Sequence, residues 1–162
     1  MRKLTCAAAA ALTVVSPANA ACWTAEHADA ARVRDLQTFL MVETLRCSAI
    51  GFNISRQYNA FVRGNRAAIG QANDKLKAFF IRSSGPVYGQ TAYDRFTTRL
   101  ANSYGASPTD EGTCDAARSV AEEGALMEND SEGLMMIADR QGLDPELPGG
   151  ICGRNTMAAR QR

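Results

Sequence analysis

The sequence is poor in the residues that most catalytic and metal sites use. It contains one histidine, His27, and no Cys-x-x-Cys pair. A zinc site takes about four cysteine or histidine ligands, usually in closely spaced pairs, so we expect no metal site. The glycine patterns of nucleotide sites, Gly-x-x-x-x-Gly-Lys and Gly-x-Gly-x-x-Gly, are also missing. The sequence therefore predicts no metal and no cofactor.

Catalytic candidates are correspondingly few. Nucleophilic catalysis needs a base beside the nucleophile, most often a histidine. His27 lies near the first turn of a predicted helix, beside Glu26 and Asp29, where capping or solvation is the expected role. Acidic residues crowd the segment Glu122–Glu132, and a carboxylate pair can perform glycosidic acid–base chemistry. Such dense charge is typical of a solvated helix face, however, so we predict no catalytic residue.

Long apolar runs are absent except at the N-terminus. The chain begins with Arg2 and Lys3, continues with the apolar stretch Leu4–Val15, and leaves it through the small residues of Ser16–Ala20. The stretch is shorter than the roughly 20 residues that span a bilayer, and the pattern is that of a secretory signal peptide. We predict a signal peptide at residues 1–20 and a periplasmic or secreted mature chain with no transmembrane segment.

One of the five cysteines, Cys6, lies inside the predicted signal peptide. The other four are Cys22, Cys47, Cys114 and Cys152, and they lie far apart in the sequence. An even number of cysteines in an exported chain predicts two disulfides, which would leave no free thiol to act as a nucleophile. A lipid anchor on Cys22 is an alternative, because small residues precede it.

Apolar residues recur every three to four positions in several stretches, as they do in amphipathic helices. This spacing predicts helices at residues 24–47, 54–83, 91–104 and 114–127, and a short fifth helix from about residue 131. The second and third helices are separated by the breaker Gly85-Pro86. Thr113 is the predicted cap of the fourth helix, and Asp130 or Ser131 is the predicted cap of the fifth.

No stretch of the chain shows the two-residue alternation of a β-strand. The fold class is therefore all-α: a disulfide-stapled helical bundle of four helices plus a short fifth. The bundle domain is predicted at residues 21–147. A C-terminal tail at residues 148–162, tied by Cys152, follows it.

The helix order predicts the disulfide pairing. Cys22 and Cys47 flank one helix, whose roughly 25 residues hold them about 37 Å apart, far beyond the span of about 4.4–6.8 Å that a disulfide allows. Short connections make neighbouring helices antiparallel, so the end of the first helix meets the start of the fourth. We therefore predict the bridges Cys47–Cys114 and Cys22–Cys152.

Charge is distributed unevenly along the chain. Residues 21–105 carry 11 basic and 6 acidic residues, whereas residues 106–147 carry 2 basic and 11 acidic ones. Over the whole chain the basic and acidic residues nearly balance, which predicts no nucleic-acid partner. The basic half places five arginines on predicted helix faces: Arg56, Arg63, Arg66, Arg95 and Arg99.

Guanidinium groups suit phosphate and carboxylate partners, which leaves two interpretations of these arginines. They form a face for a partner protein or an anionic envelope component, or they dock against the acidic fourth and fifth helices.

Three stretches carry a family resemblance. They are Cys22-Trp23, the segment Arg34–Val42 with Leu45-Arg46-Cys47, and the segment Tyr93–Gly105. Together they resemble a family of short exported helical proteins of Gram-negative bacteria with no established activity, some of which are labelled S-adenosyl-L-homocysteine hydrolase. That enzyme class has a much longer chain with a dinucleotide-binding fold. The resemblance therefore implies no catalytic residue here.

These observations favour a non-enzymatic binding or structural protein of the cell envelope. The alternatives are a small periplasmic hydrolase that uses a carboxylate pair within Glu122–Glu132, with or without His27, and an inhibitor or accessory subunit.

Overall fold

The computed structural model describes residues 22–106 and 108–153; the predicted signal peptide and the last nine residues lie outside these ranges. Its helices are α1 (Ala25–Ala49), α2 (Ser55–Gly64), α3 (Arg66–Gly105), α4 (Glu111–Ala125) and α5 (Ser131–Arg140). The described residues hold no strand, and one isolated bridge joins Trp23 to Ile151. The chain is an all-α, disulfide-stapled bundle, as the sequence predicts.

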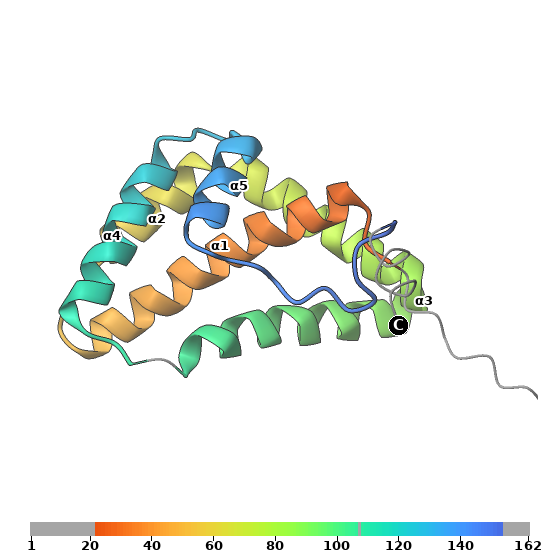
Figure 1. Cartoon of the computed structure of the whole chain (residues 1–162), viewed down its shortest axis with the longest axis horizontal. Helices are drawn as coiled ribbons and strands as arrows, with labels where there is room; N and C mark the ends of the chain where they lie inside the picture. Colours follow the sequence, from red (N-terminus) through yellow and green to blue (C-terminus); the bar gives the residue numbers. More distant parts are fainter. Residues whose placement is uncertain (1–21, 107, 154–162) are drawn as a thin grey trace, which may run out of the picture.

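The long helix α3 bends at Gly85, whose φ of 79° and ψ of 167° are not helical. We call residues 66–84 its first arm and residues 86–105 its second arm; Figure 1 shows the two arms as the sides of a V. The predicted break at Gly85-Pro86 is confirmed. The single helix predicted at residues 54–83 is wrong, because Asn65, with φ −113° and ψ 23°, separates α2 from α3.

The helix caps agree with the predictions only in part. Asp110 begins α4: its Oδ1 accepts hydrogen bonds from the Thr113 backbone N–H and hydroxyl, each at 2.7 Å. The predicted cap Thr113 therefore lies inside the first turn, so that prediction is wrong. Asp130 caps α5 as predicted, accepting from the Glu132 N–H at 3.0 Å.

The central helix is α1, which contacts each of the other four. Figure 1 shows α2 and α4 on one side of it and the second arm of α3 on the other. The largest fully buried apolar side chains come from four of the helices and from the segments that precede α1 and α2. They are Trp23, Leu36, Leu40, Ile54, Phe61, Leu76, Phe96, Leu134 and Ile137.

The disulfides are Cys47–Cys114 and Cys22–Cys152, the same pairs that the helix order predicts. Cys47 and Cys114 are fully buried, whereas Cys22 and Cys152 are exposed. A lipid anchor on Cys22 requires a free Sγ for its thioether. Because the Sγ of Cys22 is bonded to Cys152, the structure contradicts that alternative.

The C-terminal segment crosses the molecule to reach the start of the chain (Figure 1). The Trp23 N–H donates to the Gly150 carbonyl at 2.9 Å, and the Trp23 indole donates to the Pro148 carbonyl, also at 2.9 Å. The indole is fully buried between the two arms of α3, with Phe79 on one arm and Phe96 on the other. The predicted tail is therefore an ordered strap as far as residue 153, and it holds Trp23 in the core.

Within the described ranges, no helix combines the length and the apolar character that crossing a membrane requires.

Candidate functional site

The five arginines singled out from the sequence are all exposed. None of them forms a hydrogen bond or an ion pair with another residue that the structure describes. The interpretation in which they dock against the acidic helices is therefore wrong. They also do not form one surface, because Arg56 and Arg63 lie on α2, whereas Arg95 and Arg99 lie across α1 on the second arm of α3 (Figure 1).

The basic helix α2 nevertheless packs against the acidic helix α4. The contact is close: a Cβ at Gly124 would lie 2.8 Å from the Phe61 ring, so the ring occupies the space of a missing side chain. Gln57 on α2 donates to Glu122 on α4 at 3.3 Å. Packing and neutral donors, rather than arginine–carboxylate pairs, hold the two helices together.

Asn65, between α2 and α3, ties this helix pair to the turn before α5. Its side chain is fully buried. Nδ2 donates to the carbonyl of Gly124 at 2.7 Å and to that of Phe61 at 3.0 Å, and Oδ1 accepts from the Asn129 N–H at 3.0 Å. Asn129 in turn accepts from the Ala67 N–H at 2.8 Å, which caps the start of α3. The two asparagines therefore fix how α2, α3 and α4 meet.

An open groove of about 480 Å³ runs between α2 and α4. We call it the α2–α4 groove. Its apolar floor includes Ala60, Ala125 and Leu126, and the Leu126 side chain is 76% exposed. Arg56 and Glu122 lie on opposite edges of it. The groove thus combines an exposed apolar floor with a cation that has no partner within the chain.

The acidic segment Glu122–Glu132 is exposed apart from Gly124, Ala125 and Met127. Only Glu122 and Glu123 border the α2–α4 groove, and Glu123 forms an ion pair with Arg140. Asp130 is occupied as the cap of α5. The structure therefore does not bring the carboxylates of this segment together around one enclosed space. Within the described residues, no three potential ligand side chains are grouped to hold a metal ion.

His27 accepts a hydrogen bond from Arg82 at its Nε2, at 2.9 Å. Since a guanidinium only donates, Nε2 carries no proton, and Nδ1–H donates to the Thr24 hydroxyl at 2.7 Å. Partial burial, and then the Arg82 charge, lower the pKa of His27 below its usual 6.5. Both ring nitrogens are therefore engaged: Nε2 links the start of α1 to α3, and Nδ1 binds Thr24, the cap of α1.

A second hollow, of about 280 Å³, lies between α1, α3 and α5. Alanines 30, 68 and 72 form much of its wall, and the ion pair between Glu26 and Lys75, at 2.9 Å, lies at its edge. The charged residues that line it are all paired, because Asp29 forms an ion pair with Arg32, so it offers a ligand no unpaired charge.

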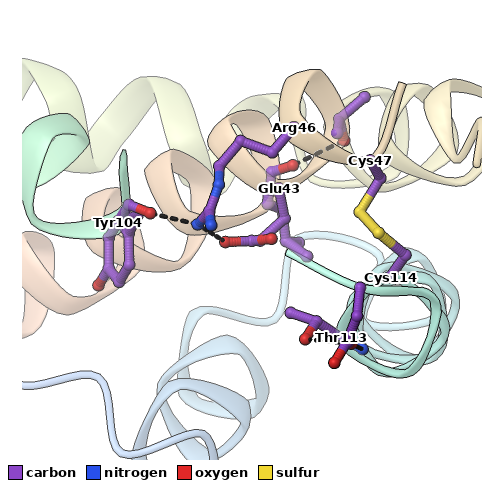
Figure 2. The surroundings of a disulfide bond; sticks show 9 residues. Glu43, Arg46, Cys47, Tyr104, Thr113 and Cys114 are labelled. Carbon is purple, nitrogen blue, oxygen red and sulfur yellow. Dashed lines mark hydrogen bonds and ion pairs between the residues drawn. A yellow bond between two sulfur atoms is a disulfide. The ribbon is translucent and has the colours of Figure 1, made fainter. Parts of the chain in front are cut away.

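A buried polar network joins α1 to the end of α3. The Tyr104 hydroxyl donates to Asp35 Oδ1 at 2.7 Å, and the Tyr104 carbonyl accepts from Arg46. Arg46 also pairs with the buried Glu43 at 2.9 Å. Figure 2 shows Arg46 between Glu43 and Tyr104, close to the Cys47–Cys114 disulfide. This network fixes the second arm of α3 against α1.

Asp35 also lines a cavity of about 180 Å³, which we call the Asp35 cavity. The second arm of α3 and the segment after α5 form the rest of its wall; the contributors include Phe96, Arg99, Leu100, Asp144 and Glu146. Burial raises the pKa of Asp35, and the charge of Asp144 raises it further, while the Tyr104 hydrogen bond lowers it. Burial and the neighbouring Asp35 raise the pKa of Tyr104.

Sequence reasoning missed this cavity. Neither Asp35 nor Tyr104 was singled out as a site residue from the sequence. The available signal was a carboxylate inside the apolar stripe of α1, next to the fully buried Leu36. The two longer stretches that carry the family resemblance meet at this cavity, since Asp35 lies in one and Tyr104 in the other.

Comparison with known proteins indicates no family or function for this chain. No protein-family model matches the sequence, and no curated protein or solved structure matches it significantly. The family resemblance therefore stays a prediction, and the function has to be argued from the site itself.

Proposed function

We propose that the protein is exported and acts in the cell envelope as a non-enzymatic binding protein, with the α2–α4 groove as its binding site for another protein. The N-terminal pattern of residues 1–20 supports export. Two disulfides that use all four remaining cysteines suit an oxidising compartment outside the cytoplasm.

The observation that carries the proposal is the combination of exposed apolar surface with unpaired positive charge. Leu126 is 76% exposed in the floor of the groove. Arg56 lies at the edge, and Arg63 lies seven residues, or about two turns, further along the same face of α2. Neither arginine has a partner in the described part of the chain. An apolar floor with a charged edge is the arrangement that binds amphipathic helices.

The partner that fits this groove is a protein segment with an apolar stripe and acidic residues beside it. The acidic residues would pair with Arg56 and Arg63, and the apolar stripe would cover Leu126. Glu122 and Glu123 compete little for these arginines, because Gln57 and Arg140 already engage them. An inhibitor or accessory subunit is a special case of this function, since either one binds another protein.

A site-specific photocrosslinking experiment in cells tests the proposal. A photoreactive amino acid is placed at Leu126, and a matched control carries it at Met136, which is 53% exposed on α5 away from the groove. We expect a crosslinked protein product at position 126 that is weakened by Arg56→Glu and unaffected by Arg95→Glu.

Three results would count against a protein-binding groove. Equal products at positions 126 and 136 would show non-specific contact. A product that Arg56→Glu leaves unchanged would remove the role of charge. Crosslinks at position 126 to lipid alone would point to an anionic envelope component instead.

A further inference from the structure

The Asp35 cavity contains a buried carboxylate that has no counterion. Asp35 is 1% exposed, and its Oδ1 accepts from Tyr104. Its Oδ2 makes no hydrogen bond within residues 22–106 and 108–153, and Asp35 forms no ion pair there. Buried carboxylates in proteins are ordinarily paired with a cation or fully hydrogen-bonded. The second oxygen of Asp35 is not sealed inside the protein, so an occupant of the cavity can pair with it.

Other residues that line the cavity add negative charge near Asp35. Asp144 and Glu146 line it from the segment after α5. Arg99 is the one cation among the lining residues, but it is exposed and pairs with none of these carboxylates. Asp144 and Glu146 are exposed as well, but the lining still carries three carboxylates and one guanidinium, and this excess of negative charge favours a cationic occupant.

The size and the apolar wall of the cavity narrow the class of cation. A metal ion needs several ligand atoms at short range, and no three potential ligands are grouped that closely in the described chain. The cavity has a volume of about 180 Å³, and Phe96 and Leu100 give it an apolar wall. These features suit an organic cation with a short carbon chain. An ammonium group can donate to the open oxygen of Asp35, while the charges of Asp144 and Glu146 favour a cation at longer range.

We propose that the Asp35 cavity binds a small organic amine, whose ammonium group pairs with Asp35 and whose carbon body lies against Phe96 and Leu100. The charges of Asp144 and Glu146 favour the cation at longer range. Tyr104 holds Asp35 in place from the opposite side. This site lies on the second arm of α3, across α1 from the α2–α4 groove, so it is independent of the protein-binding function proposed above (Figure 1).

An NMR titration of the disulfide-bonded chain tests the inference with three matched probes: n-butylammonium, n-butanol and butyrate. We expect butylammonium to shift the amide signals of residues 99–104 and 143–147 in a saturable way. The neutral and anionic probes should not do so. Asp35→Asn keeps an acceptor for Tyr104 but loses the charge, so it should weaken butylammonium binding at least tenfold. The control Asp74→Asn changes an exposed carboxylate on the other arm of α3 and should leave binding unchanged.

Asp144→Asn and Glu146→Gln provide a second test that does not depend on the buried position. Both residues are exposed, so folding should tolerate the changes, and the double variant should weaken butylammonium binding at least threefold. The inference is overturned if butylammonium causes no saturable shift or if n-butanol shifts the same signals equally. Unchanged affinity in Asp35→Asn or in the double variant would overturn it as well.

Discussion

Replacing Asn65 by alanine should destabilise the fold far more than its small size suggests. The substitution removes three hydrogen bonds of a fully buried side chain. The Phe61 carbonyl keeps a second donor, the Asn65 N–H at 3.1 Å. The Gly124 carbonyl keeps the Met127 N–H at 3.2 Å, so the Asn129 N–H is the backbone group that loses its partner.

A buried polar group without a partner costs about 1–3 kcal/mol. One such group gives about 1–3 kcal/mol, and the two hydrogen bonds lost to the Phe61 and Gly124 carbonyls add about 0.5–1.5 kcal/mol each. Because Asn129 is exposed and water can reach it, we expect about 2–4 kcal/mol for Asn65→Ala. With a urea dependence of about 1–3 kcal/mol per molar, the unfolding midpoint should fall by about 1–2 M. Urea unfolding followed by circular dichroism, with both disulfides intact, measures this shift.

The matched control is Asn59→Ala, at an exposed position of the same helix α2. The Asn59 side chain makes no hydrogen bond with a described residue, so its loss should change the free energy of unfolding by less than about 0.5 kcal/mol. If Asn65→Ala lost less than about 1 kcal/mol, or no more than the control, the argument that Asn65 joins α2, α3 and α4 would be refuted.

Three further predictions concern titratable groups and disulfides. Partial burial and the Arg82 charge should keep the pKa of His27 below 6.5; NMR of this single imidazole should show Arg82→Gln raising the pKa only in part, because the burial remains. Mild thiol reduction should open the exposed bridge at Cys152 before the buried bridge at Cys47, since the attacking thiolate needs access; alkylation and peptide mapping would contradict this if the buried bridge opened first. Burial raises the pKa of Asp35 above its usual 3.8, so the folded state holds a proton that the unfolded state releases. The contribution of Asp35 to stability should therefore fall as pH rises from 3.8 through the raised pKa. In urea unfolding, the free energy of unfolding of Asp35→Asn should rise relative to that of the wild type across this pH range. A difference between the two proteins that stays constant with pH would contradict the prediction.

The sequence alone was sufficient for the all-α class, for most of the helices and for the disulfide pairing. Apolar spacing reports which face of a helix is buried, and this signal is contained within a few turns of the chain. The positions of Cys47 and Cys114 then follow from the order and direction of the helices, and the structure pairs them with Cα atoms 5.6 Å apart. The break at Gly85 was equally visible, because glycine followed by proline interrupts a helix wherever it occurs.

The tertiary structure alone decided the features that depend on distant contacts. Asn65 ends α2 because its side chain binds groups about sixty residues away, Gly124 and Asn129, and no local pattern marks that choice. Whether Arg56 pairs with an acidic helix depends on side-chain geometry between α2 and α4, which charge counts along the chain do not contain. In the sequence, Asp35 is one acidic residue among others in a predicted helix. Only the fold places Tyr104 and the cavity wall, both on the second arm of α3, beside it. Local periodicity therefore determined the elements of this protein, whereas its binding sites arose only where those elements meet.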